Sequence, residues 1–63
     1  MKTKTVALRE AKNRFSAAVN EAQTTVLIIT RHGRPAAAII GIDGLDLVDA
    51  TRELEKFAAR RTR

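Results

Sequence analysis

Residues 26–42, VLIITRHGRPAAAIIGI, decide the fold of this chain. Two apolar runs, Val26–Thr30 and Ala36–Ile42, flank the polar insert Arg31–Pro35. Runs rich in Val, Ile and Ala on either side of a Gly-containing insert predict a β-hairpin. The rest of the chain is then expected to supply the elements that cover this hairpin.

The hairpin tip concentrates positive charge. If His32 and Gly33 form a two-residue loop, Gly33 supplies the positive φ that such loops need, and Arg31 faces Arg34 across the strands. Like charges directly opposite destabilise a sheet by about 0.2–1 kcal/mol, so the pair suggests a bound anion. A solvated turn with splayed side chains is the alternative. Pro35 lacks an N–H and therefore belongs at a strand start or on an edge.

Both faces of the hairpin are apolar. Val26 and Ile28 point to one face, and Leu27 and Ile29 to the other. A sheet with two apolar faces must be covered on both, and one helix covers only one. The second face is left for another copy of the chain or for the C-terminal helix. We expect a homodimer, with residues 26–29 and 36–40 at or near its interface.

The length and composition of the chain also favour a dimer. A chain of 63 residues buries too little apolar surface to be very stable as a monomer. Without cysteine, disulfides and thiolate metal sites are excluded, and one histidine makes a structural metal unexpected. Oligomerisation is then the remaining way to stabilise so small a fold. No apolar run approaches 18 residues, so we expect no membrane span. The absence of Cys, Trp and Tyr fits a cytoplasmic chain, and no cofactor is expected.

The net charge of +5 lies entirely in residues 1–42, which carry seven basic and two acidic side chains, while residues 43–63 carry five of each. A basic domain is typical of nucleic-acid binders, although it also keeps a small protein soluble.

Outside the hairpin, three segments have recognisable patterns. Residues 2–6, KTKTV, fit a short edge strand. Residues 7–23 carry an apolar stripe at helical spacing, with a possible break near Asn13 because Ser16 could start a second helix. Residues 43–63 open with turn chemistry and continue as a helix with acids early and arginines late. The fold class is therefore α/β (α+β), with helices on a small antiparallel sheet made of the N-terminal strand and the hairpin.

Two motifs resemble the Phd/YefM family of bacterial antitoxins. They are EAKNRFS at residues 10–16 and IITRHGRPA at residues 28–36, in the family's order and separation. The resemblance implies a dimeric fold, binding of residues 1–42 to a palindromic operator, and a toxin-binding segment at residues 43–63. In this family a basic residue after the Glu-Ala pair and the Arg after Ile-Thr contact DNA, which implies Lys12 and Arg31 here. The chain departs from the pattern at Ala7, which cannot cap a helix, and at Gly41, which weakens the second strand.

The candidate binding residues fall into two groups. Basic and amide side chains of the N-terminal strand, of the helix face opposite the apolar stripe and of the hairpin tip are expected to contact operator DNA: Lys4, Arg9, Lys12, Asn13, Arg31 and Arg34. Apolar and basic side chains of the C-terminal helix are expected to contact the toxin: Leu47, Ala50, Arg52, Leu54, Phe57, Ala58, Arg60 and Arg61. This helix needs a surface to form on, and that surface is either its own domain or the partner.

The toxin's class stays open. The basic end of the chain suits an acidic cleft, such as that of a PIN-type ribonuclease, whereas Doc-like and RelE/YoeB-like toxins are equally compatible with the resemblance. Two other functions compete. A nuclease built on His32 with Arg31 and Arg34 lacks a carboxylate partner, so no catalytic site is expected. A dimeric DNA-binding repressor without a toxin is the closer alternative.

Overall fold

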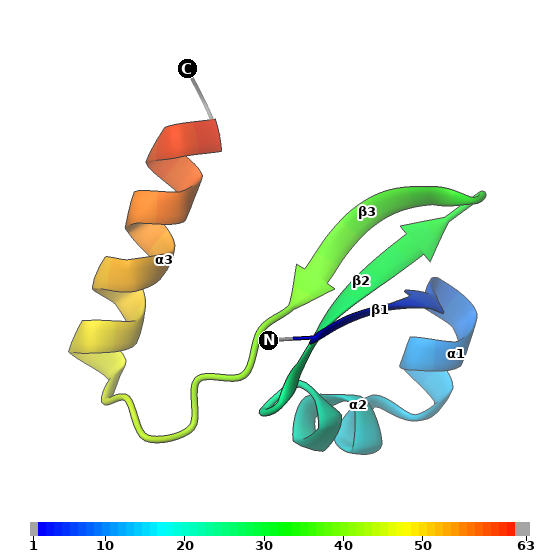
Figure 1. Cartoon of the computed structure of the whole chain (residues 1–63), viewed down its shortest axis with the longest axis horizontal. Coiled ribbons are helices and arrows are strands. Elements are labelled where there is room, and N and C mark those ends of the chain that lie inside the picture. Colours follow the sequence, from blue (N-terminus) through cyan, green and yellow to red (C-terminus); the bar gives the residue numbers. More distant parts are fainter. Residues whose placement is uncertain (1, 62–63) are drawn as a thin grey trace.

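The computed structural model describes residues 2–61 as a three-stranded sheet with three helices (Figure 1). In chain order the elements are β1 (Lys2–Ala7), α1 (Leu8–Asn13), α2 (Phe15–Glu21), β2 (Thr25–Arg31), β3 (Arg34–Ile39) and α3 (Leu47–Arg61). The α+β class, the N-terminal strand, the hairpin and the C-terminal helix are confirmed.

The sheet is mixed, with β2 in the centre. β2 and β3 pair antiparallel as expected, but β1 pairs parallel with β2, from Lys2 opposite Thr25 to Ala7 opposite Thr30. The prediction of a wholly antiparallel sheet was therefore wrong. The physical reason is the connection: α1 and α2 carry the chain back along one face of the sheet, so that β2 starts at the same end as β1.

The helical segment is broken, as the sequence suggested. α1 ends at Asn13, Arg14 takes a non-helical conformation with φ −132° and ψ 41°, and α2 begins at Phe15. The residue flanking each helix start, Ala7 or Arg14, makes no side-chain capping bond. Ser16 is not the N-cap of α2, because it lies inside the helix. Two short helices can follow the twisted sheet more closely than one straight helix.

The hairpin tip has the predicted geometry. His32 and Gly33 both have positive φ, 54° and 77°, as a type I′ turn requires. Arg31 stands opposite Arg34, and Pro35 lies on β3 at the edge of the sheet. A register shift follows Ile29, so the strands twist locally just before the tip.

The core lies between the helices and the sheet. Its members are mostly small: Ala11, Ala18, Ala22, Leu27 and Ile29. α1 packs on β1 and β2, and α2 packs on β2, whereas β3 is not among the strands they mainly contact. Residues 36–38 of β3 are therefore exposed. The helices cover only two of the three strands on this face of the sheet.

α3 stands beside the sheet after a loop that is fixed at its start (Figure 1). Gly41 N–H donates to the Ala22 carbonyl at 3.0 Å, and Asp43 N–H donates to Gln23 Oε1 at 3.0 Å. The helix itself begins at a capping residue, since Asp46 Oδ1 accepts the Asp49 N–H at 2.8 Å. The acids early in this segment thus include a true helix cap.

Candidate nucleic-acid interface and C-terminal helix

The predicted DNA-binding side chains Arg9, Lys12 and Arg31 meet around one open hollow. We call it the basic hollow; it is lined by Ala7, Leu8, Arg9, Lys12, Thr30, Arg31 and His32. None of these described lining residues is acidic. An uncompensated cluster of three cations with an aliphatic floor is a surface suited to a phosphate backbone.

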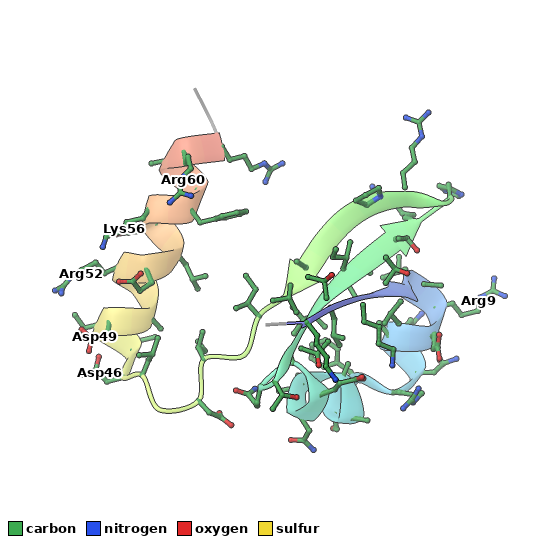
Figure 2. The ribbon with its side chains drawn as sticks, in the orientation of Figure 1. Arg9, Asp46, Asp49, Arg52, Lys56 and Arg60 are labelled. Atoms are coloured by element: carbon green, nitrogen blue, oxygen red, sulfur yellow. The ribbon has the colours of Figure 1, made fainter. Side chains whose placement is uncertain are left out.

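The topology explains why residues so far apart in the sequence meet here. Parallel pairing places Ala7 opposite Thr30 at the ends of β1 and β2. α1 starts directly after Ala7, and the hairpin tip follows directly after Thr30. The first turn of α1 and the hairpin tip are therefore neighbours, and Arg9 projects outward from this end of the molecule (Figure 2).

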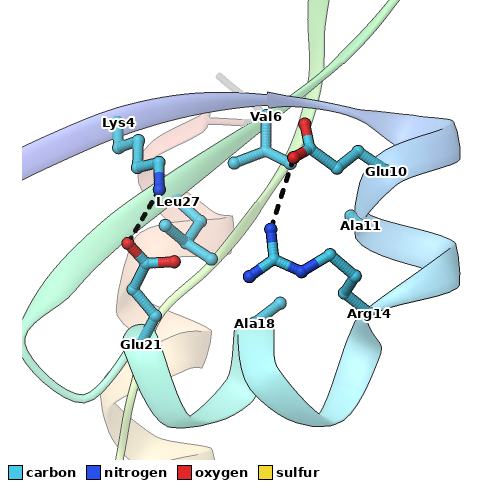
Figure 3. A pocket seen from close by; sticks show the side chains of 8 residues that line it. All are labelled: Lys4, Val6, Glu10, Ala11, Arg14, Ala18, Glu21 and Leu27. Atoms are coloured by element: carbon cyan, nitrogen blue, oxygen red, sulfur yellow. Dashed lines mark hydrogen bonds and ion pairs between the residues drawn. The ribbon is translucent and has the colours of Figure 1, made fainter.

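Three other predicted DNA contacts do not line the hollow. Lys4 is placed elsewhere: its Nζ lies 3.0 Å from Glu21 Oε2, in an ion pair that joins β1 to α2. Figure 3 shows this pair beside the Arg14–Glu10 pair, both near the core side chain of Leu27. The side chain of Lys4 thus has a structural partner.

Asn13 and Arg34 border the interface without lining the hollow. Asn13 is the exposed last residue of α1, one position beyond Lys12. Arg34 begins β3 opposite Arg31, across the turn. Sequence reasoning missed Thr30 and His32 as lining residues, although both adjoin Arg31 in the motif.

The C-terminal helix has two different sides. Leu54, Phe57 and Arg61 line a second hollow, the tail hollow. Its other wall consists of five sheet residues and the residue that follows β3: Ile28, Pro35, Ala36, Ala37, Ala38 and Ile40. Asp49, Arg52 and Lys56 project from the side away from the sheet (Figure 2). Leu54 is 45% and Phe57 57% exposed, so this apolar side is open.

Among the other predicted toxin-binding residues of α3, all are exposed except Ala50. Leu47 is 82% exposed and lies with Arg52 in a shallow depression that also includes Val48, which the sequence reasoning did not single out. Ala58 and Arg60 are exposed. Ala50 is only 4% exposed, so the chain itself already buries it.

A third hollow lies along β3 on the helix side of the sheet. This β3 hollow is lined almost wholly by apolar groups: Leu8, Ala11, Lys12, Phe15, Ile29, Ala37 and Ile39. Leu8 is 45% and Phe15 59% exposed. It exists because α1 and α2 leave β3 uncovered.

Residues 2–61 contain neither a cluster of metal-ligating side chains nor a membrane-spanning helix. No group of three or more His, Cys, Asp or Glu side chains in this part of the chain is arranged to hold a metal ion. No helix there has both the length and the apolar character needed to cross a membrane.

Comparison with known proteins identifies the family. The model of the Phd_YefM antitoxins of type II toxin-antitoxin systems matches residues 3–63. The antitoxin RelB of Mycobacterium tuberculosis (strain ATCC 25618 / H37Rv) is 43% identical over 51 residues, which cover 78% of this chain and 57% of that protein. No solved structure matches the chain. The chain belongs to the Phd/YefM family of type II antitoxins, and it spans little more than half the length of this curated relative.

Proposed function

We propose that the chain is a bacterial cytoplasmic antitoxin whose dimer binds operator DNA and represses its own operon, while α3 binds and neutralises a cognate toxin. The family membership supports the antitoxin role. The basic hollow is the observation that carries the DNA-binding part, since it gathers Arg9, Lys12 and Arg31 without an acidic neighbour in its lining. The proposal is a binding protein, with no catalytic residue.

In the proposed complex, Arg9 and Lys12 approach the duplex from α1 and Arg31 from the end of β2. Cations on two different elements can contact phosphates on either side of a groove, and an arginine between them can reach a base edge. Asn13 and Arg34 flank this surface and are secondary contacts. Lys4, held by Glu21, is left with a structural role.

Recognition of a palindrome requires two copies of the basic hollow related by a two-fold axis. The open apolar surfaces of β3 support such a dimer. Leu27 is 0% and Ile29 5% exposed, so the core of the chain already buries both side chains. The proposed interface therefore consists of residues 36–40 with the partly exposed Val26 and Ile28. Sedimentation of the free chain at micromolar concentration checks this; a compact monomer contradicts it.

The toxin-binding part rests on the open apolar side of α3. Leu54 and Phe57 line the tail hollow and are about half exposed, so both side chains are accessible to a partner that binds α3. Such aromatic and aliphatic side chains are typical anchors in helix-binding grooves. The exposed basic residues Arg52, Arg60 and Arg61 fit an acidic rim on the partner, but they do not distinguish PIN-type, Doc-like and RelE/YoeB-like toxins.

Operator binding is tested with the DNA upstream of the chain's own gene. We expect Lys12→Ala and Arg31→Ala each to weaken binding by about tenfold or more and to reduce the salt slope by about one unit per lost phosphate contact. Lys56→Ala is the matched control, because Lys56 is an exposed cation on the outer side of α3. Unchanged affinity in the double variant Lys12→Ala, Arg31→Ala contradicts the proposed interface.

The alternative is a dimeric repressor without a toxin partner. It predicts that the open apolar side of α3 has no ligand. Co-expression of the tagged chain with the product of the adjacent open reading frame separates the two functions: a stoichiometric complex supports the antitoxin, and recovery of the dimer alone favours the repressor.

A further inference from the structure

His32 is the first of the two turn residues of the hairpin and lines the basic hollow. Its backbone has φ 54°, a left-handed conformation that non-glycine residues seldom adopt. Asn, Asp and His tolerate it better than most other residues, so the turn alone does not require histidine. The imidazole is exposed and has no hydrogen-bond partner among those found in residues 2–61.

The charged side chains that line the basic hollow together with His32 are all cationic. Arg9 and Lys12 reach the hollow from α1, Arg31 precedes the turn, and Arg34 follows it. The acidic neighbour Glu10 is occupied elsewhere, since its Oε2 lies 3.3 Å from Arg14 Nη1. An anion that enters the hollow neutralises these cations and so favours a protonated imidazole in the complex.

We propose that His32 is itself a DNA contact, which donates a hydrogen bond to a phosphate in its protonated form, so that operator binding takes up a proton. This inference rests on the proposed DNA-binding function and adds a residue to its interface. Histidine is the one side chain whose charge ordinarily changes between pH 5 and 8, and this chain has a single histidine. Any proton uptake in that range by a side chain is therefore assignable to one position.

The direction of the effect follows from linkage. A cation that gains a phosphate partner holds its proton more tightly in the complex than in the free chain. Affinity for DNA therefore rises as the pH falls, and the gain is lost as the pH rises through the range in which the bound imidazole deprotonates. We expect the protonated imidazole to strengthen DNA binding about as much as one additional phosphate contact does, by about three- to tenfold in affinity.

The experiment measures operator affinity from pH 8.0 to pH 6.0 at constant ionic strength. The wild-type chain is expected to bind about three- to tenfold more tightly at pH 6.0. His32→Asn, which tolerates the left-handed turn, should bind equally at both pH values, at the wild-type level of pH 8.0. His32→Lys, charged throughout, should bind equally at both pH values but more tightly than His32→Asn.

Two outcomes overturn the inference. One is a wild-type affinity that does not change with pH; the other is a pH dependence that persists in His32→Asn. Circular dichroism of each variant confirms that the fold is retained. Failure of the proposed function is distinguishable, because the wild-type chain would then show no salt-dependent preference for operator DNA at either pH.

Discussion

Asp43 donates its backbone N–H to the side-chain oxygen Oε1 of Gln23 at 3.0 Å, although the two residues are twenty positions apart. The same amide group of Gln23 donates from Nε2 to the Val19 carbonyl at 2.9 Å. Gln23 therefore connects the end of α2 to the loop that leads to α3. The start of this loop is therefore held against the sheet-and-helix body, and the chain then turns at Gly44, which has φ 97° and lies within the turn closed by the hydrogen bond from the Leu45 N–H to the Ile42 carbonyl.

Gln23→Ala should loosen the loop before α3. It removes an acceptor for Asp43 and a donor to Val19, and each hydrogen bond contributes about 0.5–1.5 kcal/mol to stability. We expect faster amide exchange at Asp43 and a decrease of about 1 kcal/mol in the free energy of unfolding. Gln23→Glu keeps the acceptor and should protect the Asp43 amide better than Ala does; equal exchange rates in both variants would count against the connection.

Gly41→Ala should destabilise the chain because the added methyl group has no room. A Cβ at Gly41 would lie 2.5 Å from the Ala22 carbonyl oxygen and 2.5 Å from the Cα of Gln23, both of which belong to the backbone. The loop must then move away and give up the hydrogen bond from the Gly41 N–H to Ala22. We expect a loss of about 1–3 kcal/mol in chemical denaturation.

Gly33→Asn is the matched control for the loss of stability expected in Gly41→Ala. Gly33 has φ 77° and nothing within 4 Å of a Cβ, so only backbone conformation matters there. Asn tolerates this conformation, and its substitution should cost less than that at Gly41. The reverse order would show that turn geometry, rather than the close approach at Gly41, limits stability.

Lys4→Met should leave operator affinity within about twofold of the wild type, because Lys4 pairs with Glu21 away from the basic hollow. The side chains are 51% and 36% exposed, and such pairs contribute about 0.2–1 kcal/mol. A double-mutant cycle with Glu21→Gln measures this coupling in unfolding experiments. A tenfold loss of DNA affinity with a reduced salt slope would instead restore Lys4 to the interface.

Leu54→Ala with Phe57→Ala should abolish toxin neutralisation while leaving the dimer and its DNA binding intact. Both side chains are about half exposed and face the tail hollow, so their removal affects a partner more than the core. Anchors of this kind contribute about 2 kcal/mol or more each. Neutralisation is measured by rescue of growth during toxin expression.

The control for the C-terminal helix is Glu53→Ala with Lys56→Ala, two exposed residues of α3 that line neither the tail hollow nor the depression beside Leu47 and Arg52. This pair should neutralise as the wild type does. The contrary outcome is that the Leu54 and Phe57 variant unfolds while its remaining folded fraction still neutralises the toxin. In that case α3 is part of the core, and the proposed toxin-binding role of α3 is wrong.

The hairpin was predictable because its signals are local. Two apolar runs, a glycine and a proline fix the turn, and the opposition of Arg31 and Arg34 follows from the two-residue loop. The break between α1 and α2 was also visible, although its cap was not, since Arg14 rather than Ser16 precedes α2. Short helices without capping side chains leave few signals of where they begin.

Features that depend on contacts between residues far apart in the sequence were not predicted. The direction of β1 is set by how far α1 and α2 carry the chain back, which no local pattern records. For the same reason, sequence reasoning grouped Lys4 with the DNA contacts by its charge, whereas the structure pairs it with Glu21. The role of Gln23 depends on a loop twenty residues later.

The pairing of Ala7 with Thr30 has a consequence for the order of folding. The hairpin closes a two-residue loop and can form early, whereas β1 must find β2 across the whole helical connection, which is slower. Arg9 and Lys12 reach the hairpin tip only when this late pairing is complete. A chain whose first strand has not yet docked therefore has every basic residue but no assembled surface, and any ligand that binds only the docked form stabilises the pairing of that strand.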